Sequence, residues 1–289
     1  MRWRRSVSGV IVMAEFAATP MLTTPTVAVW NVMCPGHIKR LADEECATST
    51  HLVFPYRGVY VHHVGRTGFV AEPNQVLFLN ENEPYRVSHP MDGGDSTMSI
   101  RVEPDTLLEL TPDKYRHPRG RSGFDRSGVR VGPRTQQLAA TVRQRLRRGT
   151  IDALAAEEMT LELVRHALGE KRWSAPGCNG AGPRRLADHA KLLLSADVGR
   201  RWTLSDAAKS VGVSPVYLTQ AFKGVEGVPL YRYHLRLRLA RALDVLADYD
   251  DLTDLALDLG FTSHSHFTAA FRNAYGLTPS AYRRSVRTG

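Results

Sequence analysis

The residues between Ser263 and Tyr275 are spaced so that one side of a helix could contact DNA. Phe267, Phe271 and Tyr275 lie four residues apart, which predicts an amphipathic helix with these rings in the core. The opposite side is then polar and cationic, and it carries His264, Ser265, His266, Thr268 and Arg272. Imidazole, hydroxyl and guanidinium groups form hydrogen bonds with base edges and phosphates, so the chemistry indicated is recognition of DNA.

A second set of residues repeats this pattern earlier in the chain. Ser214 is a predicted N-cap, Pro215 suits the first helical position, and Leu218 and Phe222 form the buried stripe. Leu218 is equivalent to Phe267, so the two helices form an internal repeat of two units. The outer side of the first helix shows Val216, Tyr217, Thr219, Gln220 and Lys223.

Each of these helices follows a shorter helix that ends at a glycine. Thr203 and Asp206 have the spacing of a capping box at the start of the first unit, and Asp251 caps the second unit. Gly212 and Gly260 then turn the chain, because glycine adopts the left-handed conformation without penalty. A short helix, a tight turn and a second helix with a polar outer face form the geometry that enters a DNA major groove.

The stretch "PLYRYHLRLRLARALDVLAD", residues 229–248, predicts a spacer helix between the two units. Its apolar residues recur every three or four positions, which indicates one continuous helix of about 17 residues spanning about 25 Å. Such a helix could set two recognition helices near the roughly 34 Å of one DNA turn. The pattern leaves open which spacer arginines contact phosphate and which pair with acidic residues. The arginines are Arg232, Arg236, Arg238 and Arg241, and the acidic residues are Asp244, Asp248, Asp250 and Asp251.

Residues at fixed positions in both units resemble the DNA-binding domain of AraC/XylS-type transcriptional regulators. In the second unit they are Asp254, Ala256, Gly260, Phe261, Ser265, Phe267, Phe271, Arg272, Gly276, Pro279, Tyr282 and Arg283. The first unit matches more loosely, through Ala208, Ser214, Leu218, Phe222, Lys223, Gly227, Tyr233, Arg238 and Ala242. The resemblance covers roughly the last third of the chain and implies double-stranded DNA and RNA polymerase as partners. Ala269 departs from it, because members often carry an arginine there.

The composition of the chain is that of an ordinary soluble globular protein. Its 289 residues, 43% hydrophobic and 23% charged, suffice for two domains. The formal net charge of +9 favours a polyanionic partner such as nucleic acid. Three cysteines, odd in number and far apart, predict no disulfide framework, so we expect a reducing cytoplasm as the location. No stretch reaches the roughly 18 apolar residues of a membrane helix.

The first 24 residues imitate a short signal peptide, with arginines ahead of an apolar run. Glu15 interrupts that run, and the apolar part from Val10 to Ala14 is shorter than the roughly 7 to 15 residues that a signal needs. We therefore expect residues 1–24 to be a disordered tail or the product of an early start codon, with Met13 or Met21 as the true first residue.

The N-terminal half predicts strands followed by two helices. Short runs of alternating residues from about Val27 to Glu103 indicate a small antiparallel barrel or a jelly roll. The run "AEPNQVLFLNENEPYRVSHP", residues 71–90, resembles the middle of a cupin domain. Residues 104–133 are polar, rich in proline and glycine, and predict a connecting loop. Helices over 134–148 and 151–168 then form a hairpin whose apolar stripe packs either on the barrel or on a second subunit of a homodimer.

These patterns predict an α+β protein of two domains. Residues 25–170 form a cupin-like sensing and dimerisation domain with an antiparallel β-barrel and a helical hairpin. Residues 171–183 have linker composition. Residues 184–289 form an all-α domain with two helix-turn-helix units joined by the spacer helix. The predicted function is that of a sequence-specific, ligand-responsive DNA-binding regulator, without catalytic residues.

The sequence is compatible with two other functions, and they differ in the residues that they require. A cupin-type metalloenzyme fused to a helical module would need metal ligands. Its usual motif, two histidines one residue apart followed by a glutamate, is absent, and His62 and His63 must point to opposite faces of a strand. We therefore predict no metal site from the available candidates, which are His62, His63, Glu83 and His89, with Cys34, His37 and Cys46 nearby. A helix-turn-helix protein-binding adaptor would need no cationic outer faces.

A small organic effector is expected inside the predicted barrel. The segments "VYVHHV", "VLFLN" and "YRVSH", residues 59–64, 76–80 and 85–89, would line its cavity with aromatic, aliphatic and a few polar groups. Small-molecule pockets have linings of this kind.

Overall fold

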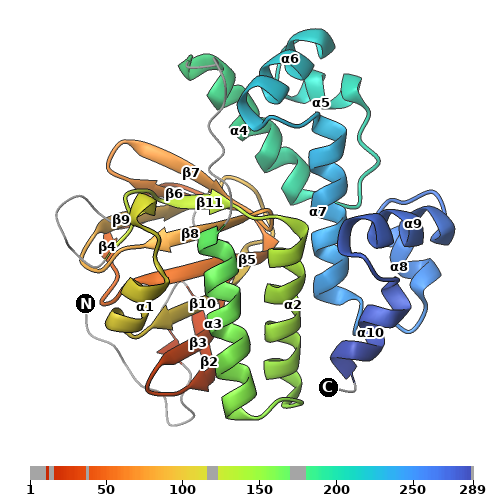
Figure 1. Ribbon diagram of the computed structural model, residues 1–289. Helices are drawn as coiled ribbons and strands as arrows, with labels where there is room; N and C mark the ends of the chain where they lie inside the picture. Colours follow the sequence, from red (N-terminus) through yellow and green to blue (C-terminus); the bar gives the residue numbers. More distant parts are fainter. Residues whose placement is uncertain (1–10, 13–15, 37–38, 116–122, 170–179, 288–289) are drawn as a thin grey trace.

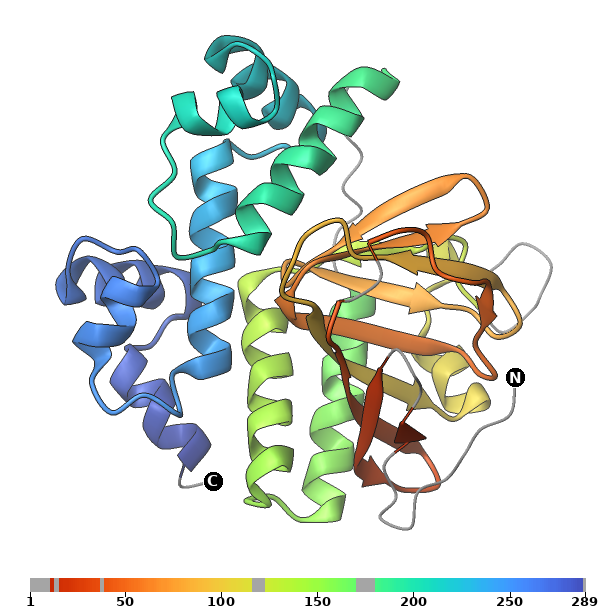
Figure 2. The same ribbon diagram turned by 180° about the vertical axis from the view of Figure 1, so that it is seen from behind.

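The chain folds into a β-rich N-terminal part and a helical C-terminal part, with a helical hairpin between them. The computed structural model describes residues 11–12, 16–36, 39–115, 123–169 and 180–287. The hairpin of α2 (Pro133–Arg148) and α3 (Ala153–Gly169) stands between the sheets and the C-terminal helices in both views (Figure 1, Figure 2). The predicted α+β organisation is confirmed at this level.

The N-terminal strands form two antiparallel sheets. The larger sheet has the order β1-β2-β3-β10-β5-β8-β11, and the smaller has the order β4-β9-β6-β7. The strands of the larger sheet are Ile11–Val12 (β1), Ala17–Thr23 (β2), Val27–Cys34 (β3), His51–Gly58 (β5), Gln75–Leu79 (β8), Asp95–Val102 (β10) and Gly128–Arg130 (β11). Those of the smaller sheet are Glu45–Cys46 (β4), Tyr60–Val64 (β6), Thr67–Ala71 (β7) and Pro84–Ser88 (β9).

The predicted closed barrel does not form among the described residues. The chain passes from the larger to the smaller sheet at Gly58, which has a φ of 73°. A Cβ atom at this position would lie 2.0 Å from the carbonyl oxygen of Gly94, so only glycine allows the two strand ends to come so close. The result is two open sheets that face each other across a cavity.

Alternation along the strands gives the larger sheet two different faces. On β10, Met98 and Ile100 belong to the apolar core, whereas Thr97 and Ser99 line the cavity. Because successive side chains of a strand point to opposite faces, one sheet can pack on helices and enclose a polar-lined space at once. The core face is covered by α3, whose Leu163 and the neighbouring Val164, Ala167 and Leu168 are buried against it.

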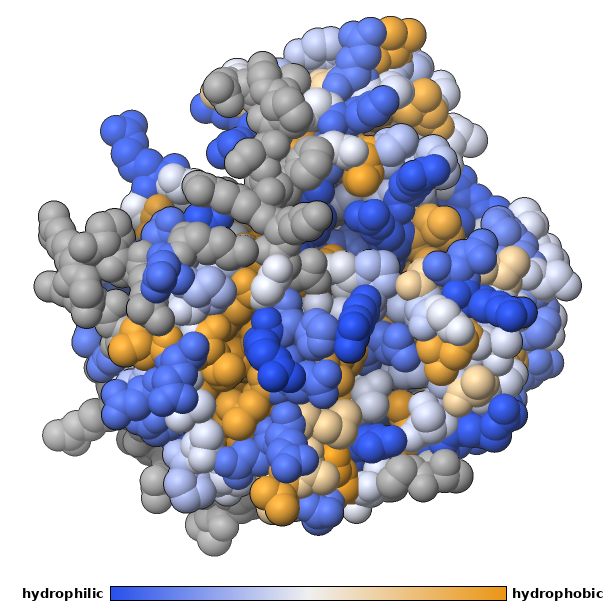
Figure 3. Space-filling view, viewed as in Figure 1, coloured by the Kyte–Doolittle hydropathy of each residue, from blue (hydrophilic) through white to orange (hydrophobic). Residues whose placement is uncertain are grey.

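The apolar stripe of the hairpin packs on other residues of the same chain. Val142 of α2 and Leu163 of α3 are buried in the N-terminal core, and Leu138, Leu146, Met159 and Leu161 pack against it. Leu154, which is 69% exposed, is the clearest exception. Over α2 and α3 the surface is a mixture of hydrophilic and apolar residues rather than one apolar band (Figure 3).

Two segments differ from their sequence-based predictions. Ala17–Thr23, expected in a disordered tail, forms β2, because its backbone pairs with β3 from Ala17↔Met33 to Thr23↔Ala28. Met21 therefore lies within a strand, while Met13 lies outside the described residues. Residues 104–133, expected to be a loop, contain α1 (Pro104–Leu110), a short 3-10 turn (Asp113–Tyr115) and β11. Glu103 caps α1 by accepting hydrogen bonds from the backbone of Asp105 and Thr106.

The C-terminal part consists of seven described helices. They are α4 (Ala181–Ala196), α5 (Leu204–Ser210), α6 (Pro215–Glu226), α7 (Leu230–Val245), α8 (Leu252–Asp258), α9 (His264–Tyr275) and α10 (Pro279–Arg287). The predicted caps are present: Thr203 and Asp206 form a capping box, and Ser214, Asp251 and Ser263 accept hydrogen bonds from the first turns that follow them. Of the predicted linker, residues 171–179 lie outside the described residues, and Ala181–Pro183 begin α4. Among the described helices, none combines the length and apolarity that crossing a membrane requires.

Candidate nucleic-acid interface and cavity

The spacer helix α7 carries a helix-turn-helix unit at each end (Figure 1). In the first unit, Leu218 and Phe222 of α6 are buried with Tyr233 of α7 and the apolar side of α4. In the second unit, Phe267 and Phe271 of α9 are buried with α7, α8 and α10. Aromatic rings packed at these positions fix each recognition helix on the spacer, as the predicted stripes require.

The outer sides of α6 and α9 are exposed where the sequence predicted them to be. Nine of the ten candidate contact residues are exposed, and Thr268 is half-buried. The nine are Val216, Tyr217, Thr219, Gln220, Lys223, His264, Ser265, His266 and Arg272. Some of these side chains also make contacts within their own unit: Thr219 Oγ1 donates to the Pro215 carbonyl at 2.9 Å, and His266 Nδ1 lies 3.2 Å from Thr262 Oγ1.

Backbone contacts fix the angle between the two units. A Cβ atom at Gly260 would lie 2.2 Å from the carbonyl oxygen of Gly199, which precedes α5. Arg238 of α7 bridges the same region, because its guanidinium donates to the carbonyl oxygens of Val198 at 3.2 Å and Arg200 at 2.9 Å. Arg238 therefore connects the units inside the protein, a role that the sequence left open.

One carboxylate joins the N-terminal part to the spacer helix. Asp244 of α7 is buried and pairs with Arg57 of β5 at 3.1 Å, with Arg143 of α2 at 2.6 Å and with Arg241 of its own helix. Its backbone carbonyl also accepts a 2.6 Å hydrogen bond from Gln144. The pairing of a spacer arginine with an acidic residue is confirmed for Arg241 and Asp244.

A second buried ionic contact reaches the end of the recognition helix α6. Glu226, the last residue of α6, pairs with Arg130 of β11 and lies 3.2 Å from Lys191 of α4. Burial lowers the pKa of Lys191, but the carboxylates of Glu226 and Asp188 outweigh burial and raise it overall. Lys191 is therefore charged, and the position of α6 depends on charges of both parts of the chain.

A cavity of about 690 Å³ lies between the two sheets. The predicted segments contribute to it through alternate residues: Tyr60 and His62 of β6, Tyr85 and Val87 of β9, and the nearby Leu79 and His89. Trp30 of β3 lines it from the larger sheet. The volume falls within the roughly 300–1,000 Å³ of small-molecule pockets.

Histidines provide much of the polar lining of this cavity. His51 is hydrogen-bonded to Ser49 at 3.0 Å and to Ser99 at 2.9 Å, and burial together with the charge of Arg101 lowers its pKa to about 4. Burial, with a smaller contribution from His63, also lowers the pKa of His62 to about 4, so its ring is neutral at pH 7. Both ring nitrogens of His62 are buried, and neither has a hydrogen-bond partner among the residues that the structure describes.

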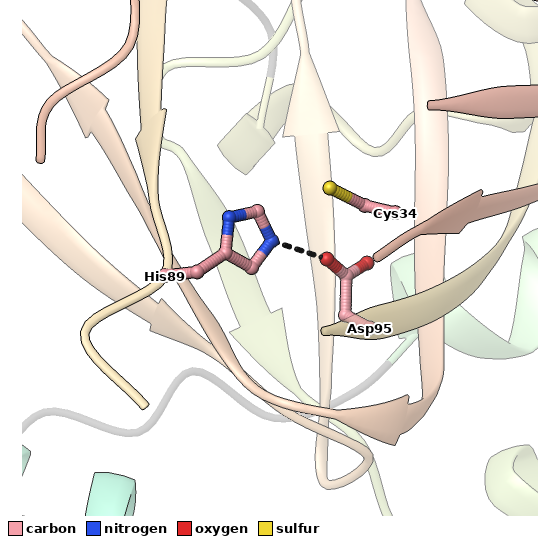
Figure 4. A group of neighbouring side chains, drawn as sticks. All are labelled: Cys34, His89 and Asp95. Carbon is pink, nitrogen blue, oxygen red and sulfur yellow. Dashed lines mark hydrogen bonds and ion pairs between the residues drawn. The ribbon is translucent and has the colours of Figure 1, made fainter. Parts of the chain in front are cut away.

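Three potential metal ligands meet at one end of the cavity. Cys34, His89 and Asp95 each offer one ligand atom, and these atoms all lie within 4.8 Å of one another. Figure 4 shows the three side chains pointing toward one another, with His89 Nε2 2.6 Å from Asp95 Oδ1. Burial lowers the pKa of His89, but hydrogen bonds to Asp95 and Cys34 outweigh burial and raise it to about 9.

The sequence did not predict that Cys34, His89 and Asp95 lie together. His62 and His89 both line the cavity, but His63 is hydrogen-bonded to Ser88 outside it, which confirms that neighbouring histidines face opposite ways. Of the other candidates, Cys46 also lines the cavity, Glu83 accepts a hydrogen bond from Asn80, and His37 lies outside the described residues. Asp95 was missed because it begins β10 of the larger sheet, whereas its partner His89 follows β9 of the smaller sheet.

Comparison with known proteins relates the C-terminal part to transcriptional regulators. The family described as a helix-turn-helix domain matches residues 207–285. The regulator ArgR of Pseudomonas aeruginosa is 31% identical over 135 residues, which are 46% of this chain and 41% of ArgR. An AraC-like transcription regulator of Streptomyces lividans is 28% identical over 152 residues, which are 51% of this chain and 50% of that protein. The chain thus matches half or less of the length of each.

A solved structure is also similar in sequence to part of the chain. The crystal structure of a transcriptional regulator from Chromobacterium violaceum, described as an AraC-type DNA-binding domain-containing protein, is 31% identical. The match covers 37% of this chain and 96% of that one, with a TM-score of 0.35. The family match over residues 207–285 and the sequence relatives named above identify the C-terminal part of the chain as the helix-turn-helix domain of the AraC-type transcriptional regulators.

Proposed function

We propose that the chain is a sequence-specific transcriptional regulator that reads double-stranded DNA through α6 and α9 and responds to a small ligand. The observation that carries the proposal is the two-sided arrangement of both helices, buried aromatic residues on one side and exposed polar residues on the other. Helices displayed in this way can enter successive major grooves on one face of a duplex. The protein then acts in the cytoplasm, with RNA polymerase as a partner at the promoter.

The exposed side chains divide into base contacts and phosphate contacts. Gln220 can form a two-point contact with adenine, and Val216, which is 67% exposed, can meet a thymine methyl group. The remaining proposed base contacts are Tyr217, Thr219, His264, Ser265, His266 and Thr268. Lys223 and Arg272 lie toward the C-terminal ends of α6 and α9 and are proposed to bind phosphates.

A binding titration on full-length protein tests this assignment. With a site selected from a random DNA library, log K should fall linearly with log salt, by about 0.9 per phosphate neutralised. Lys223→Ala should weaken binding to all sequences and lower the slope by about 1, whereas Gln220→Ala should relax base preference and keep the slope. Failure to select a site, or binding independent of salt, would instead favour a protein-binding adaptor.

The cavity between the sheets supports a small organic effector. Its lining combines aromatic and aliphatic walls, such as Trp30 and Val87, with a few polar groups, such as His51 and Tyr85. On this basis we also propose a cupin-like sensing role for the N-terminal part. We propose no enzymatic reaction, since the similar proteins named above are regulators. Effectors can be found by thermal-shift screening of small organic compounds, and tryptophan quenching that is lost in a Trp30→Phe variant would be the sign of binding in the cavity, since the chain has four tryptophans.

A path of contacts leads from the cavity wall to the spacer helix. Trp30 faces the cavity, and its neighbour Asn31 accepts a 2.6 Å hydrogen bond from the Tyr56 hydroxyl. The Tyr56 ring lies 3.9 Å from the guanidinium carbon of Arg143, which pairs with Asp244 of α7. An effector that shifts β3 would thereby alter the contact that holds α7.

Linkage makes this control mechanism testable. The effector can change DNA affinity only by binding two states of the protein differently, and DNA must then change effector affinity by the same factor. Tyr56→Phe removes the hydrogen bond to Asn31 and keeps the ring, so it should lower this factor while leaving effector affinity without DNA unchanged. If Tyr56→Phe leaves this coupling factor unchanged, the alternative is control through homodimer formation by the α2–α3 hairpin. Sedimentation with and without effector would measure the homodimer.

A further inference from the structure

Cys34, His89 and Asp95 are brought together by the pairing of strands. Cys34 ends β3, Asp95 begins β10, and the two residues are direct partners in the antiparallel ladder. His89 follows β9 of the opposite sheet by one residue. Directly opposed residues of an antiparallel pair have Cβ atoms about 4.5–5.5 Å apart on one face, so the sheet itself holds two of the three donors in place.

Glycine packing keeps this corner of the cavity compact. Gly94 precedes Asp95 with a φ of 63°, and a Cβ atom on it would lie 2.1 Å from the carbonyl oxygen of Cys34. A Cβ atom on Gly36 would in turn lie 2.5 Å from the Cα atom of Gly94. The backbones on either side of the donor group therefore approach as closely as glycine permits, and the group is built on strand ends rather than on a free loop.

The donor atoms are those that a borderline transition metal prefers. A thiolate sulfur, an imidazole nitrogen and a carboxylate oxygen are all ligands of Zn²⁺, whereas Ca²⁺ and Mg²⁺ take oxygen ligands. His89 Nε2 already faces Asp95 Oδ1 at 2.6 Å, and all three ligand atoms lie within 4.8 Å. A single ion could contact all three after small side-chain adjustments if it displaces the proton held between His89 and Asp95, which is then released to solvent.

We propose that this group binds one divalent transition-metal ion of the Zn²⁺ class, with a coordination position open to the cavity. All three residues line the cavity, so an ion held by them faces the enclosed space directly. Three protein ligands and one open position form the arrangement of zinc sites that bind a further molecule, whereas purely structural sites use four protein ligands.

An independent observation in the same cavity indicates a missing ligand. His62 is 2% exposed and lines the cavity, and within the described part of the chain neither of its ring nitrogens has a hydrogen-bond partner. It pairs with Val87 on β9, so it lies diagonally across from His89 on the same face of the smaller sheet. Because a buried polar group without a partner costs free energy, His62 requires a polar group inside the cavity, and a water or ligand atom on the metal ion supplies one.

Cobalt substitution of the full-length protein tests the site. Protein freed of metal with a chelator and kept under a phosphine reductant is titrated with Co²⁺. We expect one Co²⁺ per chain, visible absorption of a tetrahedral ion, a sulfur-to-cobalt charge-transfer band in the near ultraviolet, and loss of these signals when Zn²⁺ is added. Binding of no stoichiometric Co²⁺ or Zn²⁺ by the folded parent protein would overturn the proposal.

Matched cysteine variants identify the sulfur ligand. Cys34→Ser should abolish the charge-transfer band and weaken Co²⁺ binding at least tenfold, and Asp95→Asn should weaken binding while keeping the band. The chain has three cysteines, so the double variant Cys46→Ser/Cys178→Ser retains only Cys34. This variant should keep both the charge-transfer band and the Co²⁺ affinity. Survival of the band in Cys34→Ser, or its loss in the double variant, would assign the metal to another place and refute the site.

Discussion

Arg143 Nη2 of helix α2 lies 2.6 Å from Asp244 Oδ1 of the spacer helix, and both side chains are almost completely buried. This pair lies at the contact between the β-rich part and the DNA-binding part. A buried ion pair adds little net stability, but removal of one partner leaves an uncompensated buried charge. The contact therefore fixes the position of α7 more than it strengthens the fold.

Asp244→Ala should lower the free energy of unfolding by about 3–5 kcal/mol, because Arg143 would lose its buried counter-charge. Urea denaturation of the full-length protein measures the change. Asp248→Ala is the matched control, since Asp248 pairs with Arg147 and Arg148 at the surface and is 47% exposed. Exposed pairs contribute less than about 1 kcal/mol. Equal losses in both variants would show that Asp244 is no more than a surface contact.

Two glycines with the same backbone conformation should differ in their tolerance of alanine. Gly260 and Gly276 have φ angles of 76° and 77°, which cost a side-chain-bearing residue about 1–2 kcal/mol. A Cβ atom at Gly276 meets no described residue within 4 Å, whereas at Gly260 it would clash with the Gly199 carbonyl and the Arg238 guanidinium. In thermal unfolding, Gly276→Ala should lower the stability only by this conformational cost of about 1–2 kcal/mol. Gly260→Ala should lose clearly more, and also DNA affinity, because the angle between the units must change.

Core and contact positions of the recognition helices should respond in opposite ways. Phe267→Ala or Phe271→Ala should cost roughly 3–5 kcal/mol of stability, since each removes a fully buried ring from a small core. Gln220→Ala and His266→Ala should change stability by less than about 0.5 kcal/mol and still reduce affinity for the selected DNA site. Phenylalanine variants that melt like the parent would invalidate the assignment of the helix faces.

Acid should destabilise the fold through its buried neutral histidines. Burial, aided by the charge of Arg238, lowers the pKa of His234 to about 4, although the Val198 carbonyl opposes the shift. The folded state then binds fewer protons than the unfolded state between about pH 6.5 and pH 4. Stability from His234 is complete above pH 6.5 and is lost as the pH falls toward 4, by up to about 3 kcal/mol.

His234→Gln tests this pH dependence in denaturation curves recorded from pH 7 to pH 4. The variant should have a shallower fall in stability on acidification than the parent protein. His264→Gln, which removes an exposed imidazole of α9, should leave the fall unchanged. A parental slope in His234→Gln would exclude the histidine as a source of acid sensitivity.

Local patterns predicted both helix-turn-helix units and the spacer helix, but not α10. Caps such as Ser214 and Ser263, turns such as Gly260, and the buried stripes all depend on residues within one or two helical turns. Such signals are contained in short stretches of sequence. The ten proposed DNA contacts follow from the same periodicity, and their individual roles stay predictions.

Contacts between distant segments could not be predicted in this way. Nothing near Asp244 in the sequence indicates that Arg57 and Arg143 reach it, and nothing near Cys34 indicates pairing with Asp95. The loop-like composition of residues 104–133 likewise did not indicate α1 or β11. In the case of β11 the reason is that the strand exists only through its pairing with β8. Strand partners and buried ion pairs are properties of the whole fold, which a single sequence without its relatives does not reveal.

The shared use of Asp244 also limits how this protein could be recombined with others. A chimera that joined its N-terminal half to the DNA-binding half of another regulator would retain Arg57 and Arg143 and lose their carboxylate unless the acceptor has an acidic residue at the same place on its spacer helix. The two halves are therefore not freely interchangeable modules. A working hybrid regulator that takes its N-terminal half from this chain must therefore carry an acidic residue at the position of Asp244.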